Sequence, residues 1–287
     1  QFVHKTAAAA GSSGWTAQPW QEDGQLTLHD MDVLLGFCVR LGLPVPRKWQ
    51  GHMTGATITN DRGWDILGSW TGSKKWWDRC HNAVQRMLCD MIESAGGTTR
   101  MEPRTWDTGD VREEDGGGRR RPDIVAILSD GSEITVDVVG FWRHLTSFRS
   151  LYREGGAGAV EAEKGKKTRY EGALHRRHRT LNIGVPVDQW VRDQTADFYA
   201  AGFECTGALG PRMKELFTRI EESAQINTVG ADLYHWSAMT FRNHWRAVIG
   251  ATIMRFVARS LQGASKHAHR QRGVSGDTRP HDGLDSM

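Results

Sequence analysis

Hydrophobic positions along the chain follow two different periods. Between residues 124 and 139, two short β-branched runs flank a turn of Ser129, Asp130 and Gly131, which is the pattern of a hairpin with largely buried strands. Elsewhere the apolar residues recur every three or four positions, as they do on one face of an amphipathic helix. The sequence therefore predicts a protein that contains both helices and strands.

Helical spacing is clearest at residues 74–95, where Trp77, Cys80, Val84 and Leu88 begin one apolar stripe. Gly96 and Gly97 then end that helix. The same spacing predicts three further helices, at residues 26–43, 211–222 and 238–261, and a basic helix is expected at residues 159–178, after the break at residues 155–158.

Three further strands are expected outside the hairpin, at residues 98–102, 181–187 and 202–206, with a short helix between the last two. Residues 44–73 and 103–118 are rich in turn-forming and charged residues and are expected to be loops. The composition of residues 1–25, and of the basic tail 263–287, predicts disorder at both ends.

Two acidic residues stand at corresponding places in the hairpin, because Asp123 opens its first strand and Asp137 lies near the end of its second. A two-residue turn would pair Asp123 with Val138 and place the acids on opposite faces. A three-residue loop with Gly131 in the left-handed conformation pairs Asp123 with Asp137, and we predict that register. Paired carboxylates repel unless a cation lies between them, so the arrangement indicates a Mg²⁺ site; the alternative is a hairpin with two solvated acids.

Composition restricts the class of protein. The 287 residues are 38% hydrophobic, which suffices for one large or two small globular domains. The four cysteines are widely spaced without a CxxC pair, which favours a reducing compartment: Cys38, Cys80, Cys89 and Cys205. The chain has no apolar run near 18 residues and no signal peptide, so we expect a soluble protein without a membrane partner; its first residue, Gln1, suggests excision from a longer one.

Positive charges are clustered although the net charge is only +3. They concentrate at residues 119–121, 164–179 and 255–279. In the second cluster Lys166, Arg169 and Tyr170 are spaced so that their side chains could meet on one helix face, and a solvated helix face is the alternative.

The order helix, strand, Pro-Asp strand, Asp strand, basic helix, strand, helix resembles the PD-(D/E)XK restriction-endonuclease-like fold. More narrowly, residues 40–262 look like the endonuclease region at the C-terminus of site-specific non-LTR retrotransposon proteins, the reverse transcriptases of these elements. The motifs that carry this resemblance are Arg-Leu-Gly-Leu-Pro at 40–44, Asp-Arg-Gly at 61–63, His81-Asn82, Glu102-Pro103, Arg121-Pro122-Asp123-Ile124, the Gly131 turn, Asp137-Val138-Val139, the cluster 166–170 and Gly-Ala-Leu-Gly at 207–210.

The resemblance implies an α/β fold with a central mixed sheet of four or five strands, helices on both faces and a helical C-terminal segment. Residues 74–262 would form this domain, and residues 26–73 a lead-in of helix and turns with a degenerate knuckle. The implied function is a Mg²⁺- or Mn²⁺-dependent endonuclease that nicks target DNA for target-primed reverse transcription in the nucleus, as part of a retrotransposon polyprotein. RNA would be a partner through an upstream polymerase region, and the oligomeric state is left open.

The resemblance also assigns residues to roles. Asp123, Asp137 and the carbonyl of Val138 would hold the metal, and Lys166 would act on the nucleophile or the phosphate. The residues that would grip DNA are Arg119, Arg120, Arg121, Arg169, Tyr170, Arg176 and Arg177.

The sequence departs from the family pattern in two ways. A zinc knuckle would precede His81, but that stretch offers only His52, Cys80 and Cys38, so we predict no zinc. The family lysine two residues after the second acid is replaced by Val139, and Lys166, with Lys164 and Lys167 as alternatives, matches the displaced position of the retrotransposon branch. A catalytically inactive nucleic-acid-binding remnant and a protein-interaction domain are the competing functions.

Overall fold

A four-stranded mixed sheet forms the centre of the protein. The structure is a computed structural model that describes residues 30–41, 73–102, 122–141, 156–181, 184–227 and 241–275. The strands, in sheet order, are β1 (Thr98–Met101), β2 (Ile124–Ile127), β3 (Glu133–Phe141) and β4 (Phe198–Glu204). The first three pair antiparallel and β4 pairs parallel to β3, which confirms the predicted α/β class and mixed sheet.

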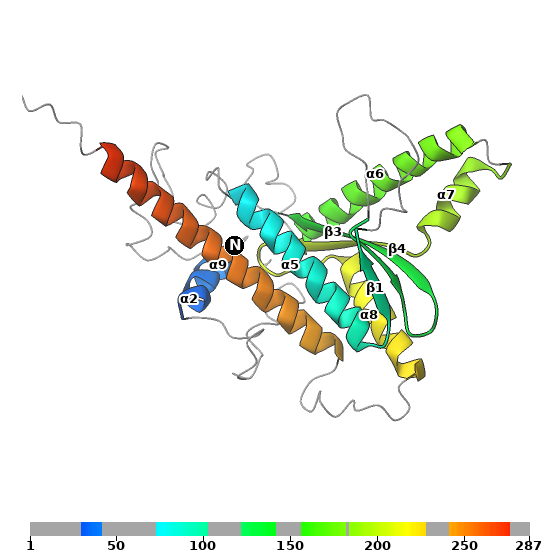
Figure 1. Cartoon of the computed structure of the whole chain (residues 1–287), viewed down its shortest axis with the longest axis horizontal. Helices are drawn as coiled ribbons and strands as arrows, with labels where there is room; N and C mark the ends of the chain where they lie inside the picture. Colours follow the sequence, from blue (N-terminus) through cyan, green and yellow to red (C-terminus); the bar gives the residue numbers. More distant parts are fainter. Residues whose placement is uncertain are drawn as a thin grey trace, which may run out of the picture.

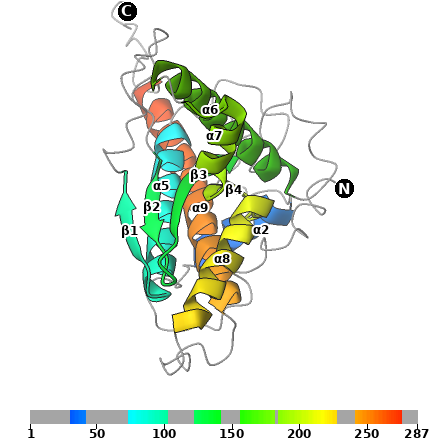
Figure 2. The same ribbon diagram turned by 90° about the vertical axis from the view of Figure 1, so that its right-hand side faces the viewer.

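Helices cover both faces of this sheet. Among the described residues they are α2 (Asp30–Leu41), α5 (Ser73–Ser94), α6 (Ala157–Leu181), α7 (Val187–Thr195), α8 (Pro211–Asn227) and α9 (Phe241–Ser275). Helices α5 and α9 run side by side, and α6 with α7 lies across the sheet from them (Figures 1 and 2). None of the helices in the described ranges is long and apolar enough to cross a membrane.

Side-chain alternation divides the sheet into two unequal cores. Val136, Val138, Ala201 and Phe203 face the main core, which they share with the apolar stripes of α5, α8 and α9. The opposite face carries a small second core of Tyr170, Phe198 and Ala200 under α6. Asp137 lies on this second face, because it pairs with Ala200 across the parallel β3–β4 ladder.

The hairpin has the predicted register. Ile124 pairs with Val136 and Ile127 with Glu133, so the same register sets Asp123 opposite Asp137. Gly131 has a φ of 83°, in the left-handed region that favours glycine. The predicted three-residue loop is closed by a 2.8 Å hydrogen bond from Leu128 N to Ser132 O.

Two predicted segments differ from the structure. The described part of the strand predicted at residues 181–187 is not a strand: Leu181 is the last residue of α6, and Pro186 occupies the N-cap position of α7, the short helix that was expected next. Strand β4 begins at Phe198 rather than at residue 202, because Phe198 and the residue after it continue the ladder with β3. At the first segment Pro186 favours a helix start over a strand, and at the second the pairing with β3 outweighs the local apolar pattern.

Helix α9 is longer than predicted, because it continues to Ser275 where the basic composition indicated disorder from residue 263. Residues 264–275 contain no proline and several good helix formers, so extending an established helix is favourable. The predictions for residues 1–25, 44–72, 103–121 and 276–287 fall outside the described residues.

Candidate functional site

Helix α6 is fixed over β3 and β4 by two buried glutamates. Glu204, at the end of β4, accepts a 2.9 Å hydrogen bond from Gly158 N in the first turn of α6. Glu163, on α6, accepts from Arg212 N and Met213 N in the first turn of α8 and from Gly202 N of β4, each at 3.1 Å. These carboxylates set the position of α6, and therefore of the side chains one turn further along.

Lys166 is the α6 side chain that reaches the acids. Its Nζ lies 2.8 Å from Asp137 Oδ1, and the Asp137 side chain is only 5% exposed. The structure therefore brings together two of the residues that the resemblance assigned to catalysis.

Asp123 lies at the point where β2 begins, and its carboxylate is tied to β3 and α5. Its Oδ2 accepts hydrogen bonds from Val138 N at 2.6 Å and from His81 Nε2 at 3.1 Å. Gln85, one turn after His81 on α5, donates from Nε2 to the backbone carbonyl of Asp123 at 2.7 Å. Helix α5 thus positions both the main chain and the side chain of Asp123.

The two acids have unequal electrostatic surroundings. Burial raises the pKa of Asp137 to about 7, although the Lys166 charge opposes this and the Asp123 charge adds to it. Burial would also raise the pKa of Asp123, but the hydrogen bond and charge of His81 hold it below its usual value. Burial disfavours the charged form of His81, yet its contacts with Asp123 outweigh this and raise its pKa.

The carboxyl groups of Asp123 and Asp137 also lie close enough for each to shift the pKa of the other. Two carboxylates approach in this way only when a proton or a cation lies between them, so the pair suits a divalent cation. No three His, Cys, Asp or Glu side chains in the described ranges form a metal centre by themselves. Mg²⁺ commonly uses only one or two carboxylates and completes its shell with waters and phosphate oxygens, so Asp123, Asp137 and the Val138 carbonyl fit this ion.

His81 is a site residue that sequence reasoning did not assign a role. Its Nε2 lies 3.1 Å from Val138 O as well as 3.1 Å from Asp123 Oδ2, so it touches two of the expected metal ligands. The available signals were the His81-Asn82 motif and the four-residue spacing to Gln85, which places both side chains on one face of a helix.

Arg169 does not join Lys166 at the acids, contrary to the predicted meeting of the three side chains, whereas Tyr170 lies near them: burial raises its pKa, and the charges of Asp137 and Asp123 add to this. Arg169 is exposed, and its Nε donates to Gly165 O of its own helix at 3.0 Å. Tyr170 is only 7% exposed and stacks on Phe198 with ring centroids 4.2 Å apart, so it belongs to the second core. Its burial excludes it from the surface that DNA could contact.

The remaining basic residues lie away from the acids. Arg176 is ten residues after Lys166 on α6, which is about 15 Å along the helix. Arg176 is exposed and Arg177 is partly buried, at the end of α6 that packs on α7. Arg119, Arg120 and Arg121 lie outside the described residues.

The four cysteines do not form disulfides. Cys38, Cys80, Cys89 and Cys205 are buried free thiols, and burial raises the pKa of the Cys80 thiol. His52, the other residue considered for zinc, is outside the described ranges.

Comparison with known proteins gave no match, either to a family model or to a curated protein sequence.

Proposed function

We propose that this protein is a Mg²⁺-dependent DNA endonuclease. The observation that carries the proposal is the pair formed by half-buried Asp123 and buried Asp137, in direct cross-strand register, with the Lys166 ammonium 2.8 Å from Asp137. Shielded acids with displaced pKa values beside a lysine are more typical of functional sites than of solvated hairpins. The resemblance described above supports the same chemistry.

Each residue has a distinct part in this proposal. A divalent cation held by Asp123, Asp137 and the Val138 carbonyl would lower the pKa of a bound water and offset phosphate charge. Lys166 brings a compact positive charge to the second face of the sheet, where it would stabilise the negative charge that accumulates on the scissile phosphate. His81 orients Asp123 through its 3.1 Å hydrogen bond.

The narrower biological role rests on the resemblance alone. In it the enzyme nicks one target strand, the freed 3′ hydroxyl primes reverse transcription, and the domain belongs to a nuclear retrotransposon protein that also binds RNA. The exposed cations of α6 would hold the DNA backbone without reading its sequence.

A nucleic-acid-binding remnant is the second candidate. It is favoured by the fact that His81 and Lys166 already satisfy the two acids, as the partners of a purely structural polar cluster would. Both candidates predict binding to phosphates, so only cleavage separates them.

The test is nicking of supercoiled plasmid in the presence of Mg²⁺. The parent protein should relax the plasmid, and Asp137→Asn should keep the fold but not the activity, because an amide lacks the charge that holds the metal. Asp193→Asn is the matched control, since Asp193 lies on the exposed surface of α7 and an asparagine can keep its hydrogen bond with Gln189.

A second measurement is independent of turnover. Mg²⁺ should raise the melting temperature of the parent and of Asp193→Asn but not that of Asp137→Asn, because a ligand that binds only the folded state stabilises it. Equal plasmid relaxation by parent and Asp137→Asn would reject Asp137 as a metal ligand. A parent that binds DNA without nicking would favour the remnant.

A further inference from the structure

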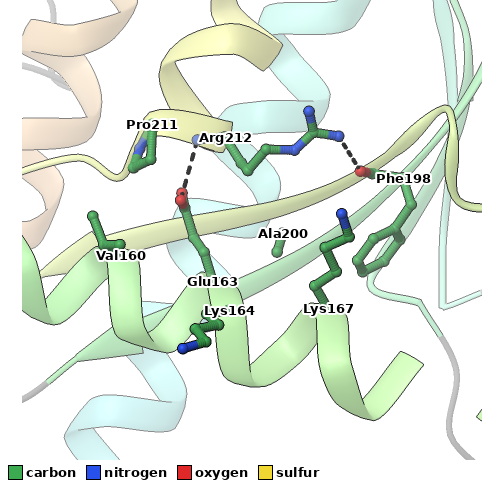
Figure 3. Close-up of a pocket in the computed structure, with 8 residues that line it drawn as sticks. All are labelled: Val160, Glu163, Lys164, Lys167, Phe198, Ala200, Pro211 and Arg212. Atoms are coloured by element: carbon green, nitrogen blue, oxygen red, sulfur yellow. Dashed lines mark hydrogen bonds between the residues drawn. The ribbon is translucent and has the colours of Figure 1, made fainter. Parts of the chain in front are cut away.

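A cavity of about 230 Å³ lies between α6, the edge strand β4 and the first turn of α8. Figure 3 shows the side chains around it, which come from these three elements. The lining residues are Val160, Glu163, Lys164, Lys167, Phe198, Ala200, Pro211 and Arg212. None of them has a role in the candidate site described above except Glu163, which holds α6 in place.

The cavity offers an apolar contact surface with few free hydrogen-bonding groups. Its floor on β4 is formed by Phe198 and Ala200, which are only 3% and 2% exposed, and more apolar surface is available at the rim, where Val160 is 46% exposed. Both Glu163 oxygens are engaged with backbone amides, and the Arg212 guanidinium donates to Phe198 O at 2.7 Å (Figure 3). A ligand would therefore be held by apolar contact rather than by a specific hydrogen-bond pattern.

Positive charge surrounds this apolar surface. Lys164 and Lys167 are exposed side chains of α6, and in Figure 3 Lys167 extends alongside Phe198. Lys167 has only a loose 3.8 Å contact with Glu171, and both lysine side chains are open to solvent. An apolar cavity with exposed cations at its edge is complementary to a base attached to phosphates.

The cavity is next to the acids. Ala200, in its floor, is the direct ladder partner of Asp137, and neighbouring strands are about 4.8 Å apart. Helix α6 therefore presents Lys166 to the acids and, on the same stretch, Glu163 and Lys167 to the cavity.

We propose that this cavity, defined by Val160, Phe198, Ala200 and Pro211, binds one unpaired nucleobase of the DNA substrate beside the cleavage site. Lys164 and Lys167 contact the phosphates on either side of that nucleotide. Because the walls lack a hydrogen-bonding pattern, the cavity accepts any base and selects for an unpaired one. This inference rests on the proposed nuclease function and adds a preferred substrate form to it.

The test compares two DNA duplexes of equal charge, measured without a divalent metal so that no cleavage occurs. One carries a single unpaired nucleotide with its base, and the other carries an abasic nucleotide at the same position. The parent should bind the first about tenfold more tightly, which is the scale expected when about 55 Å² of apolar surface is buried. Because an unpaired nucleotide is already out of the duplex, no cost of unpairing hides the difference.

Two variants locate the effect. Val160→Asp places a charge at the rim of the cavity and should abolish the preference; aspartate is tolerated there, in the first turn of α6. Leu34→Asp is the matched control, because Leu34 is a helical residue of α2 with a similar exposure of 44%, and it should keep the tenfold preference. Ala200→Leu, which fills the cavity with a neutral side chain, should also abolish the preference.

Equal affinity of the parent for both duplexes would overturn the proposal, as would an unchanged preference in Val160→Asp. Either result leaves the nuclease proposal standing if the parent nicks supercoiled plasmid. A base preference without Mg²⁺-dependent nicking would support the cavity and reject the nuclease. Absence of any DNA binding would reject both, and would direct attention to a protein side chain as the occupant.

Discussion

Lys166 reaches the acids because α6 crosses the sheet at β3. The helix therefore supplies the positive charge that Val139, at the position of the family lysine on the strand, cannot supply. The alternatives Lys164 and Lys167 lie at the cavity instead, so the geometry distinguishes among the three lysines. Unlike a lysine on β3 itself, Lys166 keeps its contact with Asp137 only while α6 holds its position. Any change that shifts α6 by part of a turn would separate Lys166 from Asp137.

Lys166→Ala should lower the nicking rate roughly a hundredfold, the usual scale for losing one electrostatic stabiliser of the transition state, while DNA affinity changes little. Single-turnover cleavage and a filter-binding titration would separate the two effects. Lys166→Arg should recover part of the rate, because it keeps the charge but not the compact ammonium. Lys214→Ala, on α8, is the control for loss of one lysine, and equal rates for it and Lys166→Ala would remove Lys166 from the site.

The residues of the site differ in how far sequence could specify them. Asp123 and Asp137 followed from strand periodicity and a turn, both of which are local. The burial of Tyr170 could not be predicted, because helical spacing shows that it shares a face with Lys166 but does not show that Phe198 covers it. His81 lies 42 residues before Asp123 in the chain, and no local pattern reports a contact over that separation.

At the scale of elements, the hairpin was predictable because its own residues fix it. Asp130 Oδ1 accepts hydrogen bonds from Ser132 N at 3.0 Å and from Ser132 Oγ at 2.7 Å, and Gly131 takes the left-handed conformation. The start of β4 and the end of α6 depend instead on distant partners. Apolar runs such as residues 181–187 suit a strand or a helix end equally well until those partners are known.

The position of α6 depends on Glu163, whose carboxylate joins three elements through backbone amides. Its surroundings leave no room for other side chains: a Cβ at Gly210 would lie 2.0 Å from Glu163 Oε1, and one at Gly202 would lie 2.4 Å from Glu163 Cγ. Glu163 lies one turn before Lys166, so this anchor holds the helix where Lys166 meets Asp137.

Glu163→Gln should destabilise the protein by roughly 1–3 kcal/mol, because a side-chain NH₂ group would then face a backbone N–H that needs an acceptor. Burial raises the pKa of Glu163 to about 7, despite the three amides that favour its charged form. A raised folded-state pKa means that its contribution to stability is complete below the unfolded value near 4.5 and is lost as pH rises through about 7.

Urea unfolding at several pH values between 4 and 8 would therefore show a smaller difference between parent and Glu163→Gln at pH 8 than at pH 4. Glu161→Gln, an exposed change on the same helix, should follow the parent at every pH. Parallel stability curves for parent and Glu163→Gln would show that this carboxyl does not titrate differently on folding.

At the scale of the whole molecule, the candidate site is assembled from the two strands of the hairpin and from two helices outside it. Helix α5 brings His81, β2 begins after Asp123, β3 contains Asp137 and α6 brings Lys166. The order of these elements could be read from the sequence through the resemblance. Their packing could not be read in this way. It depends on the core that α5, α8 and α9 share, and the apolar stripe of each helix is compatible with several partners.

Helix α6 also carries basic residues well beyond the acids. They lie at the end of the helix that packs on α7, and Figure 1 shows how these two helices are arranged. Arg176 is exposed there and Arg177 partly so, about 15 Å from Lys166 along the helix. If this arm holds the DNA backbone, its contribution is the release of counterions from phosphates, which is independent of sequence and weakens with salt.

The double variant Arg176→Ala/Arg177→Ala should weaken binding to unrelated DNA sequences by the same factor. It should also reduce the slope of log affinity against log salt by about one for each phosphate that the variant no longer neutralises. Arg86→Ala/Arg100→Ala removes the same charge from exposed positions on α5 and β1, and should change the slope less. A titration from low to physiological salt measures both, and the cleavage rate of bound DNA should be unchanged because neither arginine touches the acids. An identical slope for the parent and the α6 variant would mean that this arm does not contact DNA, and would confine the binding surface to the region around Lys166 and the cavity.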